Sequence, residues 1–449
     1  MKNVLLITID SLRADHVGYH GYDRDTTPVL DQYAEKGSRF MNAHAHVGGT
    51  RYSFPSILTG VTPLMHGGYE QISRSQTVIS EAFGDAGYRT GGFHSNLYLS
   101  ADFGYDRGWN EFFDSAPDDS MTSSLRRWAK TNLSDTPLMP VLQRGYDFLE
   151  SSSGVNIGSY HVPADEITDR AIDFLKMDND APTFLWTHYM DVHHPFLPPE
   201  KYQRLFREEP ISNRESIKLR RKFAEEPDAV TDEERQTFID LYDAEIRFND
   251  AEIGRLLDTV AEEWGDEYLV ALTSDHGEHI LEHGYFSGAQ AMDVKTHVPL
   301  FITGWDDDRG YDELVGLVHL PTTLLDAAGL DIPDSYDEYS LRKLVFENEW
   351  PREYVAGGWG DPDDRNLVIR ENEWKFIRRA DGRNELYRLS EDSAEQQNVI
   401  DTYPDQRDRL NRKLNRHLKR VEATSDESVN RPDIDEEAKR RLRRLGYQE

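Results

Sequence analysis

Short apolar runs alternate along the chain with longer segments in which apolar residues recur at helical spacing. Four runs are continuous and span residues 4–9 (VLLITI), 183–190 (TFLWTHYM), 268–275 (YLVALTSD) and 298–304 (VPLFITG). Continuous runs of this length, rich in β-branched residues, are typical of strands that a parallel sheet buries on both faces. Residues 88–94 (YRTGGFH) are also strand-like.

Four segments have the pattern of helices and span residues 26–37, 79–87, 235–264 and 404–421. The first, TTPVLDQYAEKG, has a threonine cap, a proline in the first turn and a glycine stop. The third is long and amphipathic. Because strands alternate with helices, the pattern predicts an α/β fold with a doubly wound mixed sheet flanked by helices.

The chain changes character after this alternating part. Residues 331–352 are acidic, contain prolines and are weakly patterned, which indicates a boundary. Beyond it, NLVIRENEWKFIRR and NELYRLS are typical of a small antiparallel sheet, which a charged helix follows. We therefore predict a large α/β domain over residues 1–335, a small C-terminal α+β subdomain over 350–421 and a polar tail over 422–449.

The charge of the chain narrows the possible partners. Its 449 residues include 83 acidic and 51 basic side chains, which give a net charge of −32 and an isoelectric point near 4.9. Nucleic acids and anionic membranes attract basic surfaces, so neither is an expected partner. A dense carboxylate surface with arginine favoured over lysine suits a high-salt cytoplasm. We therefore expect a halophilic protein from a haloarchaeon, and the alternative is an ordinary acidic enzyme.

The chain contains no cysteine, which excludes disulfides, zinc–thiolate sites and cysteine nucleophiles. The apolar run before Asp10 has only six residues, whereas a signal peptide needs a longer apolar region and a cleavage site. No segment approaches the roughly 18 apolar residues of a membrane span. We therefore expect a cytoplasmic protein without a membrane span.

Two of the buried strands end in an aspartate, Asp10 in LLITID and Asp275 in LVALTSDHGE. Ligands of open α/β sheets bind beyond the carboxyl ends of the strands, and the second strand end adds His276 to the same turn. Two carboxylates and an imidazole at adjacent strand ends predict a divalent metal site. The alternative is that each aspartate caps the helix that follows it. The attached histidine favours the metal.

Several segments resemble the signatures of the sulfatase family, in the alkaline phosphatase superfamily. ITIDSLRADHVGYHGYDRDTTPVLDQYAEKG resembles the N-terminal signature, TSDHGEHILEHG the second metal-binding segment and SFPSILTGVTPLMHGG the end of the nucleophile segment. Weaker similarity lies in GYRTGGFHSN, HYMDVHHPF, HVPLFI, PTTLLDAAGL and WKFIRR…NELYRLSEDSAEQQN. The resemblance runs in order from residue 3 to about 420. It implies the sulfatase-type fold and metal-dependent ester hydrolysis.

The stretch GGTRYSFPSILTG contains three hydroxyl side chains that compete for the role of nucleophile: Thr50, Ser53 and Ser56. The resemblance places the nucleophile ten residues before Gly60 of the closing TG, which is Thr50. Sulfatases carry a Cys or Ser there that is oxidised to formylglycine. Oxidation of a threonine would give a ketone, so no formylglycine is expected. Ser53 precedes a Phe-Pro pair and is suited to capping a helix; it remains the alternative nucleophile.

Three further positions depart from the sulfatase pattern. Phe54 stands where the arginine that supports formylglycine is expected, and Ser11 replaces the second Asp of the usual Asp-Asp pair. The lysine expected after GYRT is absent, and Asn96 lies in its neighbourhood. These departures resemble superfamily branches that use an unmodified threonine, such as phosphoglycerol transferases and nucleotide pyrophosphatases.

The resemblance also implies roles for other polar residues. His193 aligns with the ester-binding or leaving-group histidine, and Asn96 is expected to bind a non-bridging oxygen or to cap the turn that follows it. Lys295 and His297 are predicted to face the same rim, with packing beneath its own strand as the equal alternative for His297. Arg51 is expected to pair with the ester or with a carboxylate.

The segment after Asp275 carries three more polar side chains. Glu278 and His283 are predicted to orient the metal ligands. His279 is predicted to be solvated.

Taken together, the residues predict a metal-dependent enzyme that acts on a sulfate or phosphate ester of a small molecule or a glycan. One divalent ion is expected on Asp10, Thr50, Asp275 and His276. The resemblance implies Ca²⁺, with Mn²⁺, Mg²⁺ and Zn²⁺ as alternatives. Three functions stay open: a sulfatase-like hydrolase using Thr50, a phosphotransfer enzyme of the phosphoglycerol transferase or phosphodiesterase type, and a non-catalytic binder of sulfated or phosphorylated glycans.

Overall fold

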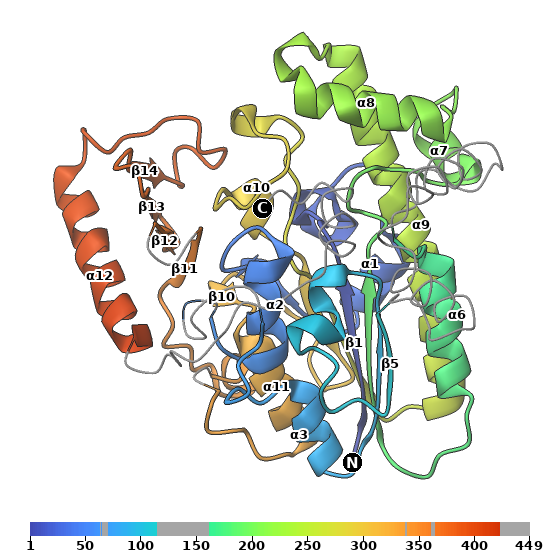
Figure 1. Cartoon of the computed structure of the whole chain (residues 1–449). Coiled ribbons are helices and arrows are strands. Elements are labelled where there is room, and N and C mark those ends of the chain that lie inside the picture. The colour runs from blue at the N-terminus through green and yellow to red at the C-terminus, as the bar shows by residue number, and fades with distance from the viewer. Residues whose placement is uncertain (63, 65–70, 115–160, 337–338, 361–363, 423–449) are drawn as a thin grey trace, which may run out of the picture.

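The computed structural model describes residues 1–62, 64, 71–114, 161–336, 339–360 and 364–422. Its centre is an eight-stranded mixed sheet with strand order β5-β4-β6-β1-β7-β8-β2-β9 (Figure 1). The bounds are β1 Asn3–Ile9, β2 Ser38–Phe40, β4 Arg89–Phe93, β5 Glu111–Phe113, β6 Thr183–Tyr189, β7 Tyr268–Ser274, β8 Leu300–Thr303 and β9 Gly310–Tyr311. All five predicted strands belong to this sheet.

The middle of the sheet is parallel. Strand β1 pairs in parallel with β6 on one side and with β7 on the other, while β8 runs antiparallel to β7. The pattern did not predict β2, β5 and β9 of this sheet, nor a separate pair, β3 (Ala43–His44) and β10 (Val315–Gly316). Each of these has only two or three residues, which is too short for a periodic signal. It also missed β11 (Val355–Trp359) of the C-terminal sheet.

Helices cover both faces of the sheet because β1 buries alternate residues on opposite sides. Val4 and Leu6 belong to a core with the helices α2 (Thr50–Thr59), α3 (Ile79–Asp85) and α11 (His319–Ala328). Leu5, Ile7 and Ile9 belong to the opposite core, with α1 (Pro28–Ala34), α6 (Ala164–Leu175) and α9 (Asp232–Trp264). The predicted doubly wound arrangement is therefore confirmed (Figure 1).

The longest helix, α9, begins three residues before the predicted start. Thr231 is its N-cap, and Thr231 and Glu234 form a capping box in which each side chain accepts from the other residue's backbone N–H. Six α-helices of the described chain were not predicted from periodicity: α2, α6, α11, α7 (Glu200–Phe206), α8 (Asn213–Glu225) and α10 (Asp293–Thr296). Every helix in the described ranges is too short or too polar to cross a membrane.

The C-terminal part forms a second, antiparallel sheet with one helix. Its order is β11-β12-β13-β14, with bounds Val355–Trp359, Asn366–Arg370, Trp374–Arg378 and Glu385–Arg388, and α12 (Pro404–Glu422) covers one face (Figure 1). The other face packs against Val47 and Met292 of the large sheet's loops. The predicted tail lies outside the described residues, and the division into domains stays a prediction.

Candidate active site

The carboxyl ends of β1 and β7 bring the two predicted aspartates together. The two strands are parallel neighbours in a register that pairs Ile9 with Ser274, so the next residues, Asp10 and Asp275, leave the sheet at the same edge. Both aspartates are completely buried. Neither caps a following helix with its carboxylate, which disfavours the capping alternative.

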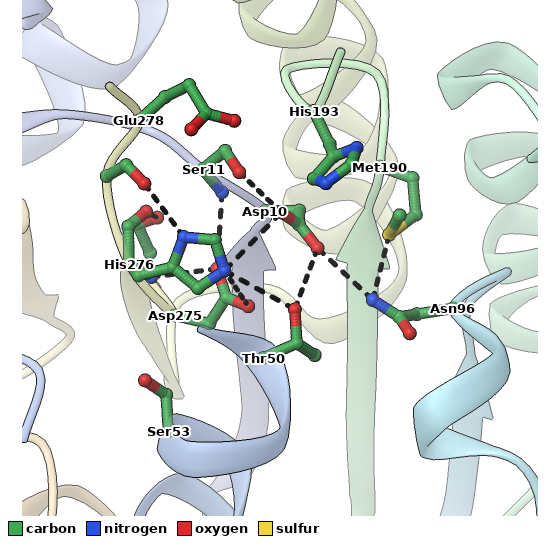
Figure 2. Close-up of polar contacts among 12 residues, drawn as sticks. Asp10, Ser11, Thr50, Ser53, Asn96, Met190, His193, Asp275, His276 and Glu278 are labelled. Carbon is green, nitrogen blue, oxygen red and sulfur yellow. Dashed lines mark hydrogen bonds and ion pairs between the residues drawn. The ribbon is translucent and has the colours of Figure 1, made fainter. Parts of the chain in front are cut away.

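A strained turn joins the two carboxylates. Ser11 has a left-handed backbone (φ 61°), which is uncommon for a residue other than glycine. In this conformation its backbone N–H donates to Asp275 Oδ1 at 3.2 Å, and its hydroxyl donates to Asp10 Oδ1 at 2.7 Å (Figure 2). Ser11, which the sequence marked only as a missing acid, therefore contacts both aspartates.

His276 presents one ring nitrogen to this pair. Its Nδ1 donates to the backbone carbonyl of Gly277 at 2.8 Å, so the lone pair of the ring lies on Nε2. That Nε2 lies 3.5 Å from Asp275 Oδ2 and 3.9 Å from Asp10 Oδ1. One ligand atom from each of the three residues lies within 4.8 Å of the others, a spacing that could hold a metal ion.

The electrostatics of the pair call for a cation. Burial alone would raise the pKa of Asp10, but its contact with His188 and the charges of His193 and His276 hold that pKa well below the usual range. Burial and the charge of Asp10 raise the pKa of Asp275 well above its usual value. Asp275 Oδ2 is buried without a hydrogen-bond donor. A divalent cation, as the sulfatase signature implies, would satisfy that oxygen and neutralise both carboxylates, so the residues fit the ion.

Helix α2 carries Thr50 to the same place. Thr50 is the first residue of the helix, after Gly49 at the N-cap, and its Oγ1 lies 3.3 Å from Asp10 Oδ2 and 3.4 Å from His276 Nε2. The prediction that Ser53 caps this helix is wrong because the helix begins three residues earlier. Ser53 is buried inside it and donates to the carbonyl of Val47 at 2.9 Å, without a contact to the aspartates (Figure 2).

A second oxygen of Asp10 is held from the other side. Asn96 Nδ2 donates to Asp10 Oδ2 at 3.1 Å, and the Asn96 carbonyl accepts from the backbone N–H of Tyr98. Asn96 therefore does cap the turn that follows it, as one of its two predicted roles required. His188, which sequence reasoning missed, lies with Nε2 at 3.6 Å from the same carboxylate oxygen. Its ring also packs against Phe54, in the position where the sulfatase pattern has an arginine.

A second buried cluster lies beside the first and contains His193, His194 and Glu278. Lys295 from α10 donates to Glu278 Oε1 at 3.2 Å, and His194 Nε2 lies 4.0 Å from Glu278 Oε2. His193 Nδ1 donates to the His194 carbonyl, so Nε2 is the nitrogen of the His193 ring that takes no part in this bond. Burial would raise the pKa of Glu278, but Lys295 and the two histidines lower it to about 2. Glu278 therefore pairs with Lys295 and makes no direct hydrogen bond to the three clustered metal candidates.

For His297 the structure favours the packing alternative over a rim shared with Lys295, because its Nε2 donates to the Met41 carbonyl at 2.9 Å and its ring stacks on His44. Two predictions about other histidines are wrong. His283 contacts the ring of His279 rather than a metal candidate. His279 is fully buried rather than solvated, and burial lowers its pKa to about 3. Part of the segment after Asp275 is therefore buried, although its polar sequence is typical of an exposed loop.

Two other side chains lie at the edge of the site. Arg51 places its guanidinium over the Tyr98 ring, 5.0 Å from the centroid. His161 was not singled out in the sequence; its Nε2 lies 3.9 Å from Asp191. Burial and, to a smaller extent, His193 lower its pKa to about 4, against the opposing charge of Asp10. It follows a polar segment without periodicity, so no pattern marked it.

Comparison with known proteins gives the family. The sulfatase family model matches residues 2–330. An arylsulfatase of Clostridium perfringens is 26% identical over 438 residues, which cover 89% of this chain and 90% of that one. A sulfatase of Formosa agariphila is 23% identical over 424 residues, which cover 88% and 82%.

Solved structures share the fold. The phosphonate monoester hydrolase of Agrobacterium radiobacter has a TM-score of 0.72 at 20% identity and covers 94% of this chain and 96% of its own. A protein in complex with its substrate D-glucosamine-2-N,6-O-disulfate has a TM-score of 0.73 at 18% identity, over 97% and 100%. The predicted fold class is confirmed: a mixed α/β sheet with a C-terminal antiparallel sheet and a polar site at the strand ends. The chain belongs to the sulfatase family and is an ester hydrolase of that family.

Proposed function

We propose that this chain hydrolyses phosphate or phosphonate esters with Thr50 as the covalent nucleophile and without formylglycine. The observation that carries the proposal is the position of the Thr50 hydroxyl, which lies 3.3 Å from Asp10 Oδ2 and 3.4 Å from His276 Nε2. A helix N-terminus is also favourable for an anionic ester. The structural similarity to a phosphonate monoester hydrolase supports this class of substrate.

Asp10, Asp275, His276 and Thr50 would hold one divalent cation. When bound, the cation would lower the pKa of the hydroxyl and neutralise charge on the ester oxygens. Ser11 holds both carboxylates in place, and the Gly277 carbonyl fixes the ring of His276. Carboxylate-rich ligation with one imidazole suits Ca²⁺, Mg²⁺ or Mn²⁺, and Zn²⁺ also accepts such donors.

The reaction then has two displacements at phosphorus. In the first, the bond from Thr50 Oγ1 to phosphorus forms as the bond to the leaving-group oxygen breaks, and that oxygen takes a proton for which His193 is the proposed donor. In the second, water attacks the phosphothreonine, the Oγ1–phosphorus bond breaks, and the water returns a proton to His193. In the first displacement the Thr50 proton would pass along its hydrogen bond to Asp10 Oδ2, and in the second it would return to Oγ1 as the bond to phosphorus breaks.

The chemistry of threonine favours phosphorus over sulfur. A formylglycine hydrate can expel sulfate by elimination, whereas a threonine sulfate must be opened by a second displacement. A second candidate is nevertheless supported by similarity to a protein whose substrate is a disulfated glucosamine. In that case water attacks a sulfate ester directly, and Thr50 only holds the cation.

A side-by-side assay tests these alternatives. Aryl phosphate, aryl phosphodiester, aryl phosphonate and aryl sulfate are compared with Thr50→Ala, Thr50→Ser and the matched control Ser53→Ala. We expect phosphorus esters to be preferred, Thr50→Ala to lose roughly 10³-fold or more in kcat, and Thr50→Ser to keep substantial activity. Ser53→Ala should stay near wild type because Ser53 binds only the Val47 carbonyl.

Mass spectrometry of a slowly hydrolysed phosphoester reads the nucleophile directly. A phosphoryl adduct on the peptide with Thr50 supports the covalent route. An adduct on Ser53 contradicts it. A third outcome would support direct attack of water on sulfate. In that case Thr50→Ala is inactive, and the wild-type protein prefers aryl sulfate and never forms an adduct.

A further inference from the structure

One tyrosine hydroxyl lies directly behind the turn that carries the aspartates. Tyr242 is on α9 and is completely buried. Its hydroxyl donates to the carbonyl of Ser11 at 2.7 Å and accepts from the backbone N–H of Arg13 at 2.9 Å. A single side-chain group therefore satisfies two backbone groups on either side of Leu12.

The residue that Tyr242 holds, Ser11, has a strained backbone. Ser11 has φ 61°, a region that residues with a Cβ seldom adopt without support from their surroundings. In this conformation the N–H of Ser11 donates to Asp275 and its hydroxyl donates to Asp10 (Figure 2). A shift of the Ser11 backbone would therefore displace hydrogen bonds to both carboxylates.

The opposite side of the turn is held by a different residue. Ser274, the last residue of β7, accepts from the N–H of Leu12 at 3.0 Å and donates to the Ile9 carbonyl at 2.7 Å. Tyr242 supplies the remaining support, and its own ring is fixed between His16 and Phe196. Burial raises the pKa of Tyr242 well above the usual value, so the hydroxyl keeps the proton that it donates.

We propose that Tyr242 is a positioning residue which holds Ser11 in its left-handed conformation and thereby orients Asp10 and Asp275 toward the cation. This inference rests on the metal-binding role proposed above for the two aspartates. Tyr242 touches neither the ester nor the ion and acts through Ser11. Groups that orient metal ligands from behind typically change metal affinity about 10–100-fold when they are removed.

The test removes one oxygen atom. Tyr242→Phe is compared with Tyr189→Phe, an equally buried tyrosine whose hydroxyl binds Thr168 instead. Binding of Mn²⁺ and of Ca²⁺ to the metal-free proteins is measured by titration calorimetry, and unfolding curves verify that both variants are folded. We expect Tyr242→Phe to weaken metal binding about 10–100-fold and Tyr189→Phe to leave it within about twofold of wild type.

Amide hydrogen exchange of the metal-free proteins gives a readout independent of activity. The N–H of Arg13 loses its acceptor in Tyr242→Phe, so a peptide that covers residues 10–16 should exchange faster. The same peptide should be unchanged in Tyr189→Phe. Equal metal affinity and equal exchange in the two variants would overturn the proposal.

A double-mutant cycle tests whether Tyr242 acts through Ser11. Glycine adopts a positive φ without support, so in a Ser11→Gly background the further change Tyr242→Phe should cost far less metal affinity than in wild type. Equal costs in the two backgrounds contradict the proposed route. Asp275→Asn separates the two levels of inference: if it binds metal as wild type does, the ligand assignment fails, whereas loss of binding there with none in Tyr242→Phe refutes only the role of Tyr242.

Discussion

Two buried clusters lie side by side at this site, and they balance their charges in opposite ways. Asp10, Asp275 and His276 bring two carboxylates together, and no lysine or arginine among the described residues forms an ion pair with either carboxylate. The neighbouring cluster of His193, His194 and Glu278 has one carboxylate, and Lys295 donates to it at 3.2 Å.

The pKa values follow this difference. That of Asp275 is raised well above its usual value by burial and by Asp10, whereas Lys295 and the histidines outweigh burial at Glu278 and lower its pKa to about 2. Asp275 of the first cluster therefore needs a positive charge from outside, whereas Glu278 of the second already has Lys295. The comparison explains why we expect one divalent ion rather than two, although both clusters have suitable donors.

The largest predicted effect comes from breaking the first cluster. Asp275→Asn keeps the size of the side chain but removes the charge that an ion would bind, so we expect the metal to be lost and activity to fall roughly 10³-fold or more. Elemental analysis and an ester assay measure the two effects. The matched variant Glu278→Gln, in the second cluster, should keep its metal. Equal metal loss in both variants would mean that the ion bridges the clusters.

The part of the site that lies on long strands could be predicted from the sequence. Asp10 and Asp275 follow uninterrupted apolar runs, and parallel strands end at the same edge of a sheet. The hydrophobic pattern alone therefore predicts that the two aspartates lie close together. Thr50 was found by similarity of motif. The short strands, Ser11 and Tyr242 could not be found in this way. Tyr242 lies in the apolar stripe of α9, where a packing residue and a hydrogen-bonding residue have the same pattern.

The loops show where sequence reasoning failed. His279 follows Asp275 in a polar segment that indicates solvent, yet it is fully buried. His283 was predicted to orient the metal ligands but contacts the ring of His279. Ser53 has the sequence context of a cap, but the chain becomes helical at Thr50 because Gly49 takes the N-cap position. Both errors arise because tertiary contacts, rather than local propensity, decide which polar groups are enclosed.

An intermediate effect is expected from removing the internal cation of the second cluster. Lys295→Met leaves Glu278 buried beside His193 and His194 without its partner, so the cluster should acquire affinity for an external ion. We expect Zn²⁺ stoichiometry to rise from one to two per chain and kcat to fall roughly 10²-fold. Equilibrium dialysis with elemental analysis measures the stoichiometry.

Lys375→Met is the matched control for this substitution. Lys375 is as buried as Lys295 and pairs with Asp293 and Glu395, but these carboxylates belong to neither cluster of the site. Its loss should destabilise the fold without adding a zinc site next to His193. A stoichiometry of one in Lys295→Met would show that the lysine is not what excludes a second ion.

The smallest predicted effect is the number of protons released when the metal binds, which distinguishes the two clusters without a large loss of function. In the metal-free protein the raised pKa of Asp275 means that the folded state holds a proton above the unfolded value of about 3.9. Stability of that state therefore falls as pH rises through the folded pKa, and metal affinity rises over the same range because the ion displaces the proton. The pH dependence of Glu278 runs in the opposite direction: its contribution to stability is present above pH about 4.3 and is lost as the pH falls toward 2.

Calorimetric titrations in two buffers of different ionisation enthalpy measure the protons released on metal binding. They should show release by wild type, up to about one proton per ion, and the same release by Glu278→Gln. No release at any pH between 4 and 8 would mean that Asp275 is already ionised in the metal-free protein, and the contrast between the clusters would then rest on geometry alone.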